Sequence, residues 1–329
     1  MAVVTVVGGG PAGVAAALAA REAGAAVTLF ERTEFPRHKV CGEFLSSEGA
    51  VVLDRLGLWE ELARDAVPIR RMTLHIGRRE VVHRLGEPAY GISRFFLDAA
   101  VLDAAVARGV TLRRERFTGS AEGTVWAAGR RAPPPNSIPK DERLFGFKAH
   151  FDGVPEDAVD LYLARDCYLG VSPVEGRITN VCGLARLGAL RRFDFDFDEL
   201  IRSLPGARER TAPLRRKWKW LTTGPVTPGA LLGPGSGSLY PAGDALAFVD
   251  PFTGTGMSNA LITGRLAGTA AAHGAPVASY RADCRKVIVG VRRVARLLRM
   301  LVNSGLADRL AWLAPGGLLY ALTRPRLGR

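Results

Sequence analysis

Cysteine is scarce in this sequence of 329 residues, and none of its four cysteines belongs to a Cys-x-x-Cys pair. Such spacing predicts neither a disulfide framework nor an iron–sulfur centre, so we expect reduced thiols. The five histidines lack metal-ligand spacing, and we expect no metal. No apolar run is long enough to span a membrane, and no basic segment precedes the first apolar run as in a signal peptide. We therefore expect a globular, cytoplasmic protein.

Positive charge is distributed unevenly along the chain. The net charge is +13, and the segment 281–329 holds 11 Lys and Arg against two Asp and Glu, which is +9 of the total. The rest of the chain carries a charge that is ordinary for a soluble enzyme. Its Arg-Arg pairs are scattered, which is typical of a solvated surface, so we do not expect nucleic acid as a partner.

The first apolar run, residues 2–7, leads into a glycine-rich segment, GGGPAG, and then into an alanine-rich segment that predicts a helix. This order of strand, GxGxxG and helix is typical of a dinucleotide-binding fold. Gly8 would allow a tight turn, Gly10 the close approach of a pyrophosphate, and Gly13 the packing of helix on strand. The start of the helix would offer N–H groups to the phosphates. A glycine-rich helix start without a ligand is the alternative.

A second apolar run, residues 26–30, predicts the next parallel strand, and Glu31 follows it directly. An acid at this position can accept a hydrogen bond from a ribose hydroxyl. The fingerprint alone does not distinguish FAD from NAD. The predicted dinucleotide-binding residues of this segment are Gly8, Gly10, Pro11, Ala12, Gly13 and Glu31.

Four later blocks make the distinction: residues 32–49, 91–109, 123–133 and 239–268. In this order, they resemble the geranylgeranyl reductase branch of the FAD-dependent oxidoreductase superfamily, which also contains p-hydroxybenzoate hydroxylase and the flavin-dependent halogenases. The resemblance extends to about residue 275 and is weak between residues 145 and 234. It implies that the dinucleotide is FAD.

The resemblance also implies roles for single residues. Gly243 and Asp244 would approach the ribityl chain and pyrophosphate, and a helix that begins near Gly256 would direct N–H groups at the pyrimidine edge of the flavin. Cys41, in a Lys-x-Cys-Gly segment, would lie near the reactive face of the flavin as the candidate catalytic residue; a buried cysteine that packs as a small hydrophobe is the alternative. Further FAD contacts are implied for Arg32, Arg37, Lys39, Arg94, Gly129, Pro251, Gly254, Thr255 and Met257.

Residues 144–234 contain apolar, strand-forming runs separated by Gly and Pro, which predict an antiparallel sheet joined by a hairpin at residues 72–85. The predicted fold is α/β: a Rossmann-like, GR2-type FAD-binding domain (residues 1–71, 86–143 and 235–284), an inserted antiparallel sheet for the substrate (72–85 and 144–234), and basic C-terminal helices (285–329). Aromatic residues of the sheet would line a substrate pocket, although plain core is the alternative. These candidates are Phe147, Tyr162, Tyr168 and Trp220.

The C-terminal segment predicts a basic amphipathic helix over residues 285–302 and a second apolar stretch over residues 310–322. Arg292, Arg296 and Arg299 would share one helical face, and Val287, Val291, Val294, Leu298 and Leu301 another. Such helices can lie on an anionic bilayer as a peripheral membrane contact. Packing on the core of the protein, with the arginines in water, is the alternative.

Two further absences limit the function. No second strand–GxGxxG–helix segment occurs, so electrons would come from transiently bound NAD(P)H or from a partner reductase. The Trp-x-Trp-x-Ile-Pro segment of halogenases is also missing. We expect an FAD-dependent oxidoreductase that reduces a C=C bond of a hydrophobic organic substrate by hydride transfer, in the manner of geranylgeranyl reductases. A monooxygenase that hydroxylates an aromatic or polyketide-like substrate is one alternative, and a non-catalytic basic binding protein is a more distant one.

Overall fold

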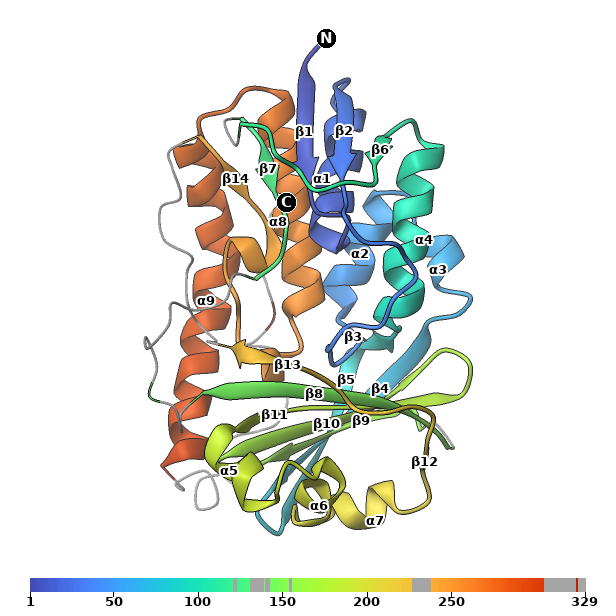
Figure 1. Cartoon of the computed structure of the whole chain (residues 1–329), viewed down its shortest axis with the longest axis vertical. Helices are drawn as coiled ribbons and strands as arrows, with labels where there is room; N and C mark the ends of the chain where they lie inside the picture. Colours follow the sequence, from blue (N-terminus) through green and yellow to red (C-terminus); the bar gives the residue numbers. More distant parts are fainter. Residues whose placement is uncertain are drawn as a thin grey trace.

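The computed structural model describes residues 1–120, 123–130, 139, 143–153, 156–226, 238–304 and 324. In this part of the chain, two β-sheets form separate layers (Figure 1). The α/β fold, with a Rossmann-like parallel sheet, a second sheet and a helical C-terminal segment, is as predicted.

The first sheet is parallel and has five strands in the described residues, in the order β14-β7-β1-β2-β6. The strands are β1 (Val3–Val7), β2 (Ala26–Phe30), β6 (Thr111–Arg113), β7 (Val125–Trp126) and β14 (Tyr240–Pro241). The helices of this half are α1 (Pro11–Glu22), α2 (Ser47–Arg55), α3 (Trp59–Leu62), α4 (Arg94–Ala107) and α8 (Gly256–Ala272), with short 3₁₀ turns η2 (Gly243–Ala245) and η3 (Pro251–Thr253).

Helices α1 and α8 pack with their backbones almost in contact, because both consist largely of small residues. A Cβ atom at Gly264 would lie 2.1 Å from the carbonyl oxygen of Ala12, and one at Gly268 would lie 2.0 Å from that of Ala16. Only glycine allows this approach. It brings the segment around residue 243 next to the first glycine turn, although the two segments lie far apart in the sequence.

The second sheet has nine strands in the described residues and lies below the first in Figure 1. Its strands are β3 (Phe44–Leu45), β4 (Val67–Ile76), β5 (Arg79–Gly91), β8 (Leu144–Asp152), β9 (Ala158–Leu163), β10 (Cys167–Val174), β11 (Ile178–Arg186), β12 (Arg215–Arg216) and β13 (Leu221–Val226). Three short helices cover its outer face: α5 (Leu187–Arg192), α6 (Phe197–Arg202) and α7 (Ala207–Thr211).

The prediction of a purely antiparallel second sheet is wrong at one strand pair. The hairpin expected at residues 72–85 is present as β4 and β5 and is longer, since its strands span residues 67–91. Strand β4 then pairs with β9 in parallel register, from Arg71 opposite Ala158 to Ile76 opposite Leu163. A parallel pair needs a long connection, and here the chain returns through α4 and the first sheet before it reaches β9.

Helix α9 (Val277–Asn303) runs beside α8 and reaches the edge of the second sheet (Figure 1). It begins at residue 277 rather than at the predicted 285, because Tyr280 and Cys284 already pack into the core. Val287 and Val291 of the predicted apolar face are buried, and Val294 is half-buried. The side chains of Leu298 and Leu301 and the stretch 310–322 lie outside the described residues. Among described helices, none combines the length and apolar character of a membrane span.

Candidate active site

The glycine turn between β1 and α1 has the geometry that a dinucleotide needs. Gly8 has φ +109°, and a Cβ there would lie 2.3 Å from the carbonyl oxygen of Ala127; one at Gly13 would lie 1.7 Å from that of Gly8. By contrast, a Cβ at Gly10 would meet only the Nη2 atom of Arg94, at 3.7 Å. Packing therefore requires Gly8 and Gly13, whereas Gly10 faces open space. Gly10 is also the N-cap of α1, whose first N–H groups have no partner within the helix.

Glu31 lies at the end of β2, and its carboxylate is held against the glycine turn. Its Oε2 accepts a hydrogen bond from the Gly9 N–H at 2.9 Å, and Oε1 accepts from the N–H and hydroxyl of Thr33 at 2.8 and 2.5 Å. Burial raises the pKa of Glu31, but these hydrogen bonds outweigh it and lower the pKa below its usual range. Three of roughly four acceptor positions are thus filled, which leaves about one for a ribose hydroxyl.

Arg94 opens α4 and forms a buried charge cluster with Asp98 and Lys39. Arg94 Nε lies 2.6 Å from Asp98 Oδ1, Arg94 Nη2 lies 2.8 Å from Oδ2, and Lys39 Nζ lies 2.5 Å from Oδ2. Burial raises the pKa of Asp98, but the two cations lower it by more than burial raises it, so the carboxylate stays charged. Burial and the Arg94 charge lower the pKa of Lys39 to about 8. Two cations share one carboxylate, so the cluster presents positive charge beside Gly10.

Arg32 and Arg37 do not join this cluster. Both are exposed, and the Arg37 guanidinium lies 5.8 Å from the ring centre of Phe35. Of the three cations predicted between residues 32 and 39, Lys39 alone is placed beside Arg94. Among the predicted cations of this segment and α4, Lys39 and Arg94 therefore supply the positive charge beside the glycine turn.

The Gly243-Asp244 segment follows β14 and lies against α1. Gly243 has φ +59°, its N–H donates to Thr263 Oγ1 at 2.9 Å, and a Cβ there would lie 2.9 Å from the Cβ of Ala12. Burial raises the pKa of Asp244, and the charges of Arg94 and Arg130 oppose this rise. The structure thus brings the two predicted FAD segments, from opposite ends of the chain, to the same place.

Arg130 was not among the predicted site residues, although it follows Gly129, which has the left-handed φ of +77°. Its guanidinium donates to Thr223 Oγ1 at 3.2 Å and lies 5.2 Å from the ring centre of Phe248. The arginine pair at residues 130 and 131 was the available signal.

Helix α8 begins directly after a glycine turn, as predicted. Pro251 opens η3, Gly254 has φ +65°, and buried Thr255 is the N-cap residue. A Cβ at Gly256 would meet nothing within 4 Å, whereas Met257 is buried in the core. The first N–H groups of α8 are therefore available beside an open position.

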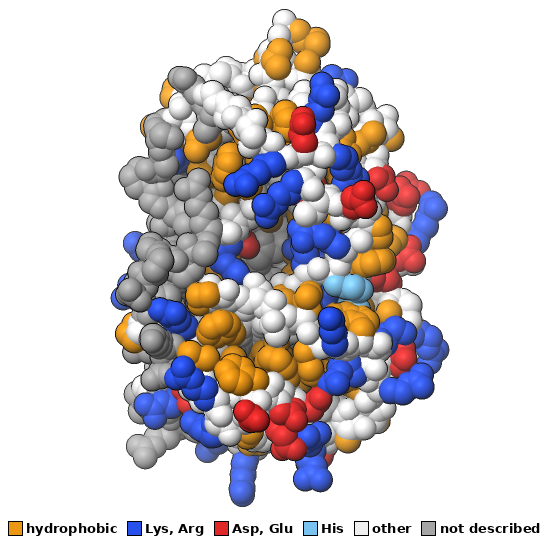
Figure 2. All heavy atoms as spheres, in the orientation of Figure 1, with side chains coloured by type: hydrophobic (Ala, Val, Ile, Leu, Met, Phe, Trp, Pro, Cys, Tyr) orange, Lys and Arg blue, Asp and Glu red, His pale blue; other side chains and the backbone are white. Residues whose placement is uncertain are grey.

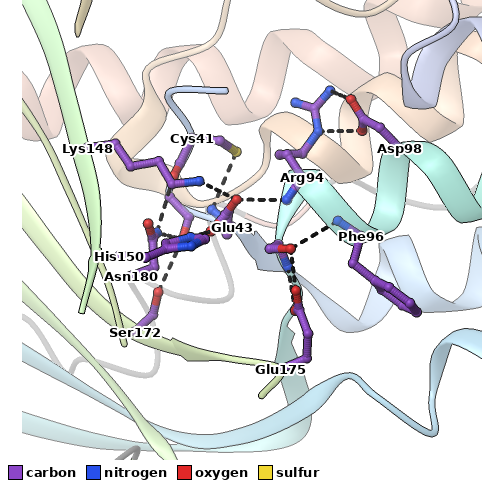
Figure 3. Close-up of polar contacts among 12 residues, drawn as sticks. Cys41, Glu43, Arg94, Phe96, Asp98, Lys148, His150, Ser172, Glu175 and Asn180 are labelled. Carbon is purple, nitrogen blue, oxygen red and sulfur yellow. Dashed lines mark hydrogen bonds and ion pairs between the residues drawn. The ribbon is translucent and has the colours of Figure 1, made fainter. Parts of the chain in front are cut away.

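Cys41 lies in a turn that is clamped onto the second sheet (Figure 3). Asn180 Nδ2 donates to the carbonyl oxygens of Cys41 and Gly42 at 3.2 and 3.0 Å, and Ser172 Oγ donates to that of Gly42 at 3.2 Å. The Cys41 thiol is half-buried, whereas the other three cysteines are buried. Cys41 also lies close enough to Arg94 to raise the pKa of that guanidinium, together with Asp98 and against the effect of burial.

Glu43 and its partners were missed in the sequence. The fully buried Glu43 carboxylate accepts hydrogen bonds from Lys148 and from the Arg94 N–H at 2.7 Å, and it lies 2.7 Å from His150 Nε2. Lys148 and His150 come from the same face of β8, far along the chain from Glu43. Pairing over such a distance has no signature in the sequence; only the position of Glu43 directly after Cys41-Gly42 pointed to it.

Three of the four predicted lining aromatics face away from this site. Since Lys148 and His150 point toward Glu43, the alternation of β8 directs Phe147 to the outer face, where it packs against Phe197 and Trp220 with ring centres 4.9 and 5.6 Å apart. Tyr162 stacks on His75 on the same outer face, at 4.2 Å. The predicted lining role of Phe147, Tyr162 and Trp220 is thus wrong, and they form core with α5–α7.

Tyr168 is the exception, because it lies on the face of β10 that also carries Ser172. Burial raises its pKa, and Cys182 and Cys41 are among the groups that interact with it. Tyr168 lines a cavity of about 50 Å³ at the edge of the sheet, with Leu144, Leu184 and Arg299 of α9 among the other lining residues. Figure 2 shows a recess between the two halves of the molecule, with Lys and Arg side chains around it.

Comparison with known proteins agrees with this geometry. Residues 1–124 match the FAD-binding domain family. The matched segment contains the glycine turn, Glu31, Lys39 and Arg94. Over 55 residues, the chain is also 47% identical to menaquinone reductase of Mycolicibacterium smegmatis, a stretch that covers 17% of the chain and 13% of that protein.

Solved structures show the same fold over nearly the whole chain. A triple mutant of the flavin-dependent brominase Bmp2 has a TM-score of 0.79 at 16% identity and covers 98% of this chain and 94% of its own. A geranylgeranyl bacteriochlorophyll reductase-like protein from Thermoplasma acidophilum has a TM-score of 0.70 at 18% identity, with coverage of 99% and 93%. The FAD-binding domain and the sheet beneath it therefore have the fold of the FAD-dependent oxidoreductase superfamily.

The residues present fit FAD. Gly10 leaves space beside the positive charge of Arg94 and Lys39, where a diphosphate can lie. Glu31 is charged at the end of β2, as a ribose partner must be. The N-termini of α1 and α8 both begin at glycine positions that a side chain does not block.

Proposed function

We propose that this FAD-dependent oxidoreductase reduces a C=C bond of a hydrophobic organic substrate. The observation that carries the proposal is the Cys41 turn, which is fixed between Arg94 and the second sheet with its thiol half-buried. The Lys-x-Cys-Gly segment around it resembles that of geranylgeranyl reductases. The 55-residue stretch that is 47% identical to menaquinone reductase, an enzyme named for reduction, supports the same reaction type.

The protein's part in this reaction is binding and orientation. Reduced FAD, when bound, supplies the hydride. Glu31 would hold the ribose, Arg94 and Lys39 would neutralise the diphosphate, and Asp244 would accept a hydroxyl of the ribityl chain. The Cys41 Sγ atom would hold a proton at the substrate end of the site.

The substrate would lie between the flavin and the inner face of the second sheet. Tyr168, Leu144 and Leu184 give this face an apolar region that continues into the cavity beside α9. A hydrophobic small molecule matches such a lining. The electron donor would be NAD(P)H that binds transiently or a partner reductase.

We also propose a peripheral membrane contact through α9, which would bring the enzyme to a lipid-soluble substrate. The outward stripe of α9 combines cationic and apolar side chains, as in helices that lie on anionic bilayers. Its exposed members are Arg285, Lys286, Arg293, Arg296, Leu297 and Met300.

Anaerobic turnover tests the proposed reaction. The purified protein, reduced with dithionite, is mixed with prenyl and isoprenoid-quinone substrates without oxygen, and products are identified by mass spectrometry. We expect two hydrogens to be added at a prenyl C=C bond, as distinct from reduction of a quinone ring to the quinol, and we expect Cys41→Ser to form this product more slowly. Cys284→Ser, on the face of α9 that packs into the protein core, serves as the control. A product that forms only with oxygen and gains an oxygen atom would show the monooxygenase. A purified protein without a visible flavin band would overturn both.

A further inference from the structure

Glu43 has a backbone conformation that is uncommon for its residue type. Its φ is +54°, in the left-handed region that glycine normally occupies, and its side chain is fully buried. Such a conformation is strained for a residue with a Cβ atom and persists only where the surroundings enforce it. The contacts of Glu43 must therefore hold its backbone in this conformation.

Every polar group of Glu43 contacts a different part of the molecule. Its N–H donates to Cys41 Sγ at 3.4 Å, and its carbonyl oxygen accepts from the Ile92 N–H at 3.1 Å. Its carboxylate accepts from the Arg94 N–H at the start of α4 and from Lys148 on β8. Glu43 thus connects the Cys41 thiol, the FAD-binding domain and the second sheet (Figure 3).

The charges around Glu43 are arranged to keep its carboxylate ionised. Burial raises the pKa of Glu43, but Lys148 and His150 outweigh burial and lower it. Replacing a buried ion pair by apolar residues of the same size is often neutral or stabilising. The contacts of the Glu43 carboxylate do, however, join the turn after Cys41 to α4 and to β8.

We propose that Glu43 is the positioning residue of the Cys41 thiol, and that Lys148 and His150 hold Glu43 in place by binding its carboxylate from β8. Asn180 and Ser172 fix the same turn through the carbonyl oxygen of Gly42. The importance of this position for catalysis rests on the proposed function, in which Cys41 lies at the reactive face of the flavin.

Alkylation of Cys41 measures its position directly, without enzyme turnover. Cys41 is half-buried, whereas burial raises the pKa of Cys167 and of Cys284 to about 12, so iodoacetamide should label Cys41 first. Glu43→Ala removes the contacts that hold the turn and should expose the Cys41 thiol. We expect Glu43→Ala to speed labelling several-fold because the released turn exposes the thiol, and Glu43→Gln, which retains one acceptor, to speed it less.

The matched control is Asp160, a buried carboxylate on β9 that lies 2.8 Å from Arg210 and 3.7 Å from His75. Asp160→Asn should lower the melting temperature without changing Cys41 labelling. If it speeds labelling as much as Glu43→Ala does, general loosening explains the result and the proposal is wrong.

A second variant covers the case in which Glu43→Ala does not fold. Ser172→Ala with Asn180→Ala removes both side-chain donors to Gly42 and should speed labelling several-fold. Wild-type labelling rates in all folded variants would overturn the proposal. The visible circular dichroism of added FAD, which should change in Glu43→Ala, tests the connection to the flavin. Faster labelling in a protein that binds no FAD would uphold the positioning role of Glu43 and refute the proposed function.

Discussion

Substitution Asp98→Asn tests whether the Arg94–Asp98–Lys39 cluster faces the FAD diphosphate. The Asp98 side chain is fully buried, and those of Arg94 and Lys39 are 16% and 19% exposed. Asparagine has the same shape but leaves two cations without their shared carboxylate. Breaking a buried ion pair by removing one partner costs about 3–5 kcal/mol. In the absence of FAD, we expect the melting temperature to fall by roughly 10 °C.

Added FAD should restore part of this loss, because the diphosphate brings the negative charge that Asp98 no longer supplies. At 100 times its dissociation constant, FAD raises the free energy of unfolding of the wild type by about 2.7 kcal/mol. For Asp98→Asn at the same FAD concentration, we expect about 2 kcal/mol more, the size of a partly screened interaction between two charges. Thermal unfolding followed by circular dichroism, with and without FAD, measures both numbers.

The control is again Asp160→Asn, which removes a buried carboxylate between His75 and Arg210 on the outer face of the second sheet. Its loss of stability should be independent of FAD. If FAD stabilises Asp98→Asn no more than it stabilises the wild type, the cluster does not face the diphosphate, and the diphosphate does not lie beside Gly10.

Three further predictions follow from the same structure. Because the pKa of Lys39 is about 8, the diphosphate should draw a proton onto Lys39 when FAD binds. FAD binding near pH 8 should therefore take up protons, and the affinity for FAD should fall as the pH rises from about 7 to 9. Calorimetry in two buffers of different ionisation enthalpy measures this uptake, which should be absent in Lys39→Met. Gly268→Ala should destabilise the protein by about 1–3 kcal/mol in urea unfolding, since the added Cβ would lie 2.0 Å from a carbonyl oxygen of α1. Gly290→Ala serves as the control: an added Cβ at this position of α9 meets open space, so the better helix propensity of alanine should stabilise the protein by about 0.5–1 kcal/mol. The protein should sediment with phosphatidylglycerol vesicles but not with phosphatidylcholine vesicles, and Arg293→Glu with Arg296→Glu should abolish this binding; equal sedimentation of the variant would refute the membrane contact.

The parallel sheet was predictable from the sequence because its signals are local. The run from Ala2 to Glu31 contains strand, glycine turn, helix, strand and acid in one short, uninterrupted segment, and each part decides its own geometry. The parallel pairing of β4 with β9 was not predictable, since it depends on how the hairpin docks on a strand that comes much later in the chain. Periodicity determines which residues alternate, but it does not determine the direction of the neighbouring strand.

Prediction of the site followed the same division. Lys39, Arg94 and Gly243 were predicted from motif resemblance, and the structure brings them together around the glycine turn. The polar partners of the Cys41 turn were not predicted, because Lys148 and Asn180 lie on different strands that meet only in the folded sheet. Aromatic residues were expected to face the site because large apolar side chains often line pockets. Three of them serve the outer core instead.

Because these aromatic residues face outward, the other side chains of the inner face determine where a substrate can lie. On the inner face of the second sheet, Lys148, His150, Ser172 and Asn180 are all engaged by the turn of residues 41–43, so that part of the face is covered. The registers of β8, β10 and β11 place Leu144, Leu184 and Tyr168 toward the other end of the same face, beside α9. The step along β8 from Lys148 to Leu144 corresponds to about 13 Å of strand. Under the proposed function, a hydrophobic substrate that reacts beside Cys41 would extend its apolar part away from the charged cluster and toward the α9 edge, where the proposed membrane-binding helix meets the sheet.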